Sequence, residues 1–147
     1  MQHDTLAGAW RATVHPDGRD PIRNDVVVHP DGTINNHDPY VGGGVGAWTR
    51  VEGAVHRARI VHGNVYDGSG TNLLDQQVAP GTVTVDVHLE VDLVDGGAAA
   101  TGRYRTELLG ADGDPVTFAG TDTPAVLVGA IRWERVEVDL DVAIPGR

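Results

Sequence analysis

The chain has 147 residues and no cysteine, and its 21 acidic and 11 basic side chains give a formal net charge of −10. This length predicts one domain over residues 1–147. The absence of cysteine excludes disulfides, thiolate nucleophiles and cysteine-based zinc sites. The acidity argues against a nucleic-acid partner, because phosphate binding needs a basic surface.

Targeting signals are not evident in the sequence. The first residues, MQHDTLAG, have neither a basic stretch nor an apolar core, so we expect no signal peptide. Nowhere do 18 apolar residues follow one another, so we expect no membrane partner. These features predict a cytoplasmic protein.

The first third of the chain predicts four strands separated by tight turns. Two of them contain the same phrase, Gly-Ala-Trp, at 8–10 and 46–48, and the sequence HPDG occurs at 15–18 and again at 29–32. Asp-Gly supplies the positive φ that tight hairpins require. The strands predicted here cover residues 6–15, 22–29, 32–37 and 44–52.

A strand predicted at 54–66 brings two histidines to its drier face. Alternation places His56 and His62 with Ala58 and Ile60, and it places Arg57 and Arg59 on the opposite, solvated face. A one-residue bulge between residues 54 and 61 would invert this assignment. The stretch 68–81 that follows is long for a connection, which is typical either of a lid or binding loop or of disorder.

The clearest strand covers 82–94, where six aliphatic residues alternate with Thr, Asp, His and Glu. Such a strand has one dry and one wet face, as in an antiparallel sheet. Further strands are predicted at 98–109, 116–121 and 126–138. No window of about 11 residues has a helical apolar stripe.

Eight or nine antiparallel strands with short turns predict an all-β sandwich or barrel. Several of the strands exceed ten residues and contain interior glycines, which suits the bends of a closed barrel. The interior glycines are Gly46, Gly63, Gly102 and Gly129. We therefore expect a single antiparallel β-barrel.

The start of the first strand resembles the Gly-x-Trp signature of the lipocalins and the wider calycin superfamily. Gly8 and Trp10 match that signature just after a short polar segment, HDT. The resemblance implies that Trp10 plugs the closed end of the barrel and that an arginine of the last strand stacks over it. Arg132 and Arg135 are the two candidates.

Small residues beside inward polar ones predict a cavity in the barrel. An eight-stranded barrel either fills with side chains or holds one small ligand, and this chain has one Phe and few large aliphatic residues. A mostly apolar cavity with a few polar groups is the usual form of a ligand site. The candidate catalytic residues are Tyr104, His56 and His62, and the candidate ligand-binding residues are Trp48, Asn24, Tyr66, Thr106 and Trp133.

Neither a metal nor a cofactor is expected. His56 and His62 do not have a standard zinc spacing, and they would lie about 20 Å apart along a strand. The segment 67–75 lacks the turn glycine and closing glutamate of a calcium loop. The sequence has no Ser-His-Asp elbow, phosphate loop or dinucleotide fingerprint.

Three functions fit these expectations. The first is a cofactor-independent cyclase or isomerase of polyketide or terpenoid biosynthesis, since the expected barrel is similar in outline to the spirotetronate cyclases and allene oxide cyclases. The second is a non-catalytic carrier or sensor of a lipophilic ligand, as the calycin resemblance implies. The third is a packed barrel that serves as a dimerisation or scaffold module. The expected partner is an apolar small molecule, with a homodimer left open.

Overall fold

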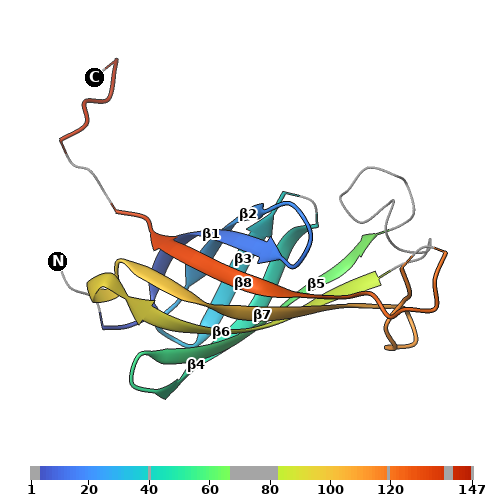
Figure 1. The fold of residues 1–147 in the computed structure, drawn as a ribbon. Coiled ribbons are helices and arrows are strands. Elements are labelled where there is room, and N and C mark those ends of the chain that lie inside the picture. Colours follow the sequence, from blue (N-terminus) through green and yellow to red (C-terminus); the bar gives the residue numbers. More distant parts are fainter. Residues whose placement is uncertain (1–3, 40, 67–82, 119, 138–140, 147) are drawn as a thin grey trace.

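A computed structural model describes residues 4–39, 41–66, 83–118, 120–137 and 141–146, with the backbone alone at 64–66 and 83. Its eight strands form one closed antiparallel barrel in which each strand pairs with its neighbours in sequence and the last pairs with the first (Figure 1). The predicted all-β barrel is thus confirmed. The strands are β1 (Gly8–Pro16), β2 (Ile22–Val28), β3 (Thr33–Asp38), β4 (Gly42–Glu52), β5 (Val55–Tyr66), β6 (Val83–Val94), β7 (Ala99–Leu109) and β8 (Val126–Arg135).

The alternation of β6 produces the expected dry and wet faces. Val85, Leu89 and Val91 are buried in the barrel. Asp86 is the exception, because it lies on the outer face and is nevertheless 6% exposed. Arg59 of β5 covers it and donates two hydrogen bonds to its carboxylate, at 2.9 and 2.8 Å. This ion pair holds the pKa of Asp86 below its ordinary value.

The strand predicted at 116–121 is wrong. This part of the chain has two isolated bridges, Leu109 with Pro115 and Thr117 with Pro124. A proline has no amide hydrogen for a strand ladder, so the two prolines prevent regular pairing. The connection between β7 and β8 instead packs Val116 and Phe118 against a small apolar cluster at one end of the barrel.

Interior glycines let neighbouring strands approach closely. At Gly46, Gly102 and Gly129 a Cβ atom would overlap a carbonyl group of the adjacent strand. Gly63 differs from them, since it has open space where its Cβ would lie. Three of the four predicted interior glycines therefore meet a steric requirement of the barrel.

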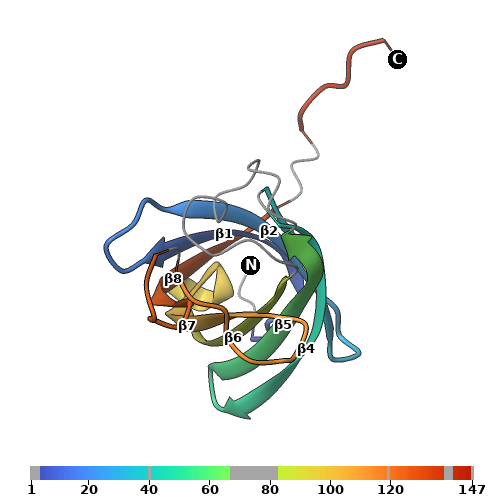
Figure 2. The same ribbon diagram turned by 90° about the vertical axis from the view of Figure 1, so that its right-hand side faces the viewer.

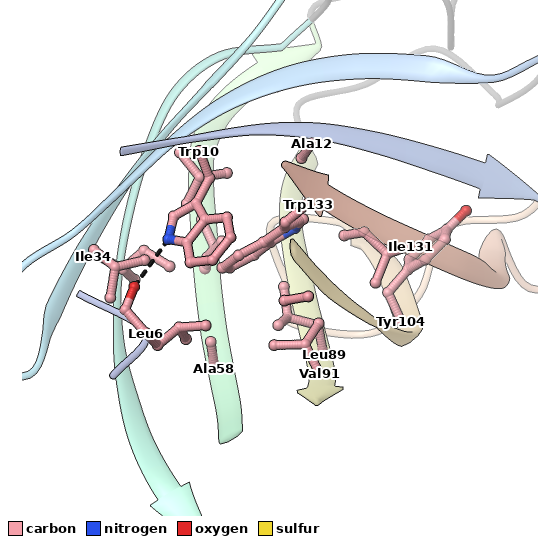
Figure 3. Packing of buried hydrophobic residues seen from close by; sticks show 14 residues of the cluster. Leu6, Trp10, Ala12, Ile34, Ala58, Leu89, Val91, Tyr104, Ile131 and Trp133 are labelled. Atoms are coloured by element: carbon pink, nitrogen blue, oxygen red, sulfur yellow. Dashed lines mark hydrogen bonds between the residues drawn. The ribbon is translucent and has the colours of Figure 1, made fainter. Parts of the chain in front are cut away.

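The main core fills the end of the barrel near the N-terminus. Trp10 of β1 and Trp133 of β8 pack there with ring centroids 5.8 Å apart, and Leu6 lies beneath Trp10 (Figure 3). The indole nitrogen of Trp10 donates a hydrogen bond of 2.8 Å to the carbonyl of Leu6. All three side chains are at most 1% exposed, so this end of the barrel is closed.

Arg135 is the arginine that covers Trp10. Its guanidinium lies 4.2 Å from the ring centre and donates hydrogen bonds to the carbonyls of Gly97, Ala7 and Thr5. Gly8 makes room for it, because a Cβ there would lie 2.5 Å from the Arg135 Nη1 atom. The other candidate, Arg132, is on the outer face beside Glu134. Gly8 and Trp10 of the first Gly-x-Trp sequence thus both contact Arg135: Gly8 leaves room for its guanidinium, and Trp10 packs against it.

Among the described residues, no helix has the length and apolar character that crossing a bilayer requires.

Candidate functional site: a cavity in the open half of the barrel

A cavity of about 100 Å³ occupies the half of the barrel away from Trp10. It lies towards the end at which β5 finishes and β6 begins, where the view along the barrel is partly covered by the β7–β8 connection (Figure 2). Much of its wall is aliphatic, including Val14, Val87, Leu89, Leu108, Leu127 and Ile131. The cavity therefore offers an apolar space between the closed core and the barrel mouth.

His62 of β5 faces this cavity. Its ring packs against Gly44, where a Cβ would lie 2.6 Å from a ring carbon, so the glycine is what admits the imidazole. The side chain is 2% exposed. Burial lowers the pKa of His62 below its ordinary value of 6.5, although nearby Asp38 and the backbone of Gly42 and Gly43 oppose the shift. The imidazole is thus neutral at pH 7.

Tyr104 of β7 also lines the cavity and is 6% exposed. Burial raises the pKa of its phenol to about 12, with a further increase from Asp17 that Arg19 and Arg103 oppose. The hydroxyl therefore stays protonated near neutral pH and can donate a hydrogen bond. Its neighbour across the strand pair on β8 is Gly129.

Trp133 forms the inner limit of the cavity. Figure 3 shows its ring between Trp10 and Ile131, with Tyr104 beyond Ile131 on the side of the cavity. Trp133 is fully buried, and its indole nitrogen can only donate a hydrogen bond. The same ring thus belongs both to the closed core and to the cavity wall.

Three buried polar atoms of side chains that line this cavity have no hydrogen-bond partner within the described residues. They are His62 Nδ1, the Tyr104 hydroxyl and Trp133 Nε1. Buried polar groups are nearly always paired, so each such atom calls for an explanation. Here the three belong to side chains that line one cavity.

Four further polar residues line the cavity, from strands β2, β3 and β7. Asn24 of β2 and Thr106 of β7, both predicted, are among them. Asn36 and Asp38 of β3 line it too and were not predicted. The signal was present in the sequence, because Asn36 and Asp38 share their face of the strand with buried Ile34.

Two predicted site residues lie elsewhere. Trp48 and His56 contact each other nearer the β4–β5 hairpin, with ring centroids 5.7 Å apart, and neither lines the cavity. Trp48 donates a hydrogen bond to the carbonyl of His29, and Nδ1 of His56 donates one to the carbonyl of Ala54. His56 is buried on the predicted face, but six residues of strand separate it from His62 by about 20 Å.

Two other predictions concern residues outside the part of the chain that the structure describes. They are the side chain of Tyr66 and the stretch 68–81, which was expected to be a lid, a binding loop or disordered. Within those residues, no three His, Asp or Glu side chains come together as a group that could hold a metal ion.

Comparisons with known proteins do not assign the chain to a family. No protein-family model matches the sequence, and no curated protein matches it closely enough to count as a relative.

Proposed function

We propose that this barrel binds an apolar small molecule in its cavity and acts on it as a cofactor-independent cyclase or isomerase. The observation that carries the proposal is that His62, Tyr104 and Trp133, whose side chains line one apolar cavity, each have an unpartnered polar atom. Leaving a buried donor or acceptor unpaired costs about 1–3 kcal/mol. A bound ligand with matching polar atoms would recover that free energy.

The dimensions suit a compact group. An apolar cavity of about 150 Å³ can hold a benzene molecule, and the cavity here measures about 100 Å³. It is therefore smaller than a benzene site, so it encloses only part of a six-membered ring, and the rest of the ligand lies at the barrel mouth.

The chemistry available is proton transfer and charge stabilisation. The neutral imidazole of His62 can accept a proton, and the phenol of Tyr104 can donate a hydrogen bond to a carbonyl oxygen as negative charge develops there. Holding a flexible substrate in a reactive pose contributes on the order of 7–11 kcal/mol in well-oriented reactions. Cyclisation or isomerisation of a polyketide or terpenoid needs little more from the protein.

A carrier or sensor of a lipophilic ligand is the second candidate. The closed end supports it, because Trp10 beneath Arg135 has the arrangement that the calycin resemblance implies. The scaffold hypothesis assumed a lumen packed with side chains, and the cavity does not fit that assumption.

The test combines binding with turnover. Polyketide-like and terpenoid compounds are titrated against the protein while tryptophan fluorescence is followed, and ligands that bind are then incubated and analysed by mass spectrometry and NMR. Binding with a change of product that is lost in His62→Gln and Tyr104→Phe supports the enzyme. Binding without any conversion supports the carrier.

His56→Gln is the matched control. His56 is as deeply buried as His62 and also has an unpartnered ring nitrogen, but it lies outside the cavity. If His56→Gln and His62→Gln reduce binding equally, the cavity is not the site and the proposal fails.

A further inference from the structure

We infer that the cavity selects an uncharged ligand that carries both a carbonyl oxygen and a hydroxyl group, and that it rejects carboxylates. This inference rests on the proposed function and specifies the class of ligand. It follows from the donor and acceptor character of the three unpartnered atoms and from the charges around them.

Two of the three atoms call for an acceptor on the ligand. Trp133 Nε1 can only donate a hydrogen bond. The Tyr104 phenol can donate or accept, and its pKa of about 12 keeps the proton on the oxygen. A carbonyl oxygen has two lone pairs and no proton, so it is the group that such donors recognise.

The third atom calls for a group that pairs with an imidazole nitrogen. His62 Nδ1 has no partner among the described residues, and burial lowers the pKa of the ring, so the imidazole is neutral. A nitrogen of a neutral imidazole either donates or accepts a hydrogen bond, according to the tautomer. A hydroxyl on the ligand can both donate and accept, so it pairs with Nδ1 in either tautomer.

The charges around the cavity exclude an anion. Among the described residues that line it, none is Lys or Arg, and Asp38 is acidic. An ion buried without a counter-charge is strongly disfavoured. The neutral His62 does not supply that counter-charge.

The two arginines whose charge acts on Tyr104 are engaged outside the wall. Arg103 lies 3.7 Å from the carboxylate of Asp17, and the guanidinium of Arg19 lies 5.2 Å from the ring centre of Phe118. Neither lines the cavity. A carboxylate in the cavity would thus face Asp38 without a basic partner.

The experiment compares four six-membered rings of similar size: 2-hydroxycyclohexanone, cyclohexanone, methylcyclohexane and cyclohexanecarboxylate. Each is titrated at about pH 7.5 into protein labelled with ¹⁵N at tryptophan, and the indole N–H resonance of Trp133 is followed. Trp133→Phe identifies that resonance. The hydroxyketone should bind at least tenfold more tightly than the carboxylate and shift the Trp133 resonance downfield.

Two variants test the individual contacts. Tyr104→Phe should reduce the preference for cyclohexanone over methylcyclohexane, because it removes one donor and little volume. His62→Phe should remove the preference for the hydroxyketone over cyclohexanone. His56→Gln, outside the cavity, should change neither ratio.

The outcomes separate this inference from the proposed function. If the carboxylate or the hydrocarbon binds as tightly as the hydroxyketone, the ligand class is wrong while a binding cavity stands. If none of the four rings shifts the Trp133 resonance, the cavity does not bind small molecules and both proposals fall.

Discussion

Replacing Arg135 by alanine should destabilise the barrel more than any other arginine replacement on β8. The guanidinium stacks on Trp10 and donates hydrogen bonds to the carbonyls of Gly97, Ala7 and Thr5, at 2.9, 2.7 and 2.8 Å. It therefore joins the last strand to the segment before β1 and to the turn between β6 and β7.

The size of the effect follows from these contacts. A cation over an indole contributes about 0.5–2 kcal/mol, and a hydrogen bond from a charged donor about 1.5–3 kcal/mol. Arg135 is partly exposed, so water replaces some of this stabilisation in the variant. We expect a loss of about 2–4 kcal/mol, which lowers the melting temperature of a protein of this size by about 4–16 °C.

The assay is thermal unfolding followed by circular dichroism, with Arg132→Ala as the control. Arg132 is three residues away on the same strand and makes surface ion pairs with Glu134 and Asp95, at 3.4 and 3.8 Å. Exposed pairs contribute about 0–1 kcal/mol, so Arg132→Ala should change the melting temperature little. Equal melting temperatures for the two variants would refute the role assigned to Arg135.

Three further predictions concern the strands and the cavity. Gly102→Ala should lower the free energy of unfolding by about 1–3 kcal/mol in urea titrations, because its Cβ would overlap a carbonyl of the facing strand. Gly63→Ala is the control and should be nearly neutral, since its Cβ would meet open space. Similar urea midpoints for the two variants would contradict this prediction. Gly44→Ala should displace the ring of His62 and weaken ligand binding measured by fluorescence titration, and unaltered affinity would count against the site. Burial lowers the pKa of His56 and His62 below 6.5, so below that pH the unfolded chain binds more protons than the folded one. The free energy of unfolding should therefore be greatest above pH 6.5 and fall on acidification. A urea midpoint that is the same at about pH 8 and about pH 5.5 would be evidence against this coupling.

Local sequence determined the eight strands of the barrel and their inward faces, although it also predicted a strand at 116–121 that the structure lacks. Alternation in β5 and β6 predicted which residues are buried, since side chains of successive residues point to opposite faces whatever the rest of the fold does. It failed at Asp86, which is buried on the outer face. There a long-range partner, Arg59, covers the carboxylate, and no property of β6 alone indicates it.

The position of each residue along the barrel axis was decided by the tertiary structure. His56 and His62 have the same phase in β5, but one packs against Trp48 and the other lines the cavity. Likewise, sequence left Arg132 and Arg135 as equal candidates, and pairing of β8 with β1 brings Arg135 opposite Trp10. Strand periodicity specifies a face, whereas the register between strands specifies which side chains meet, and register depends on the whole closed sheet.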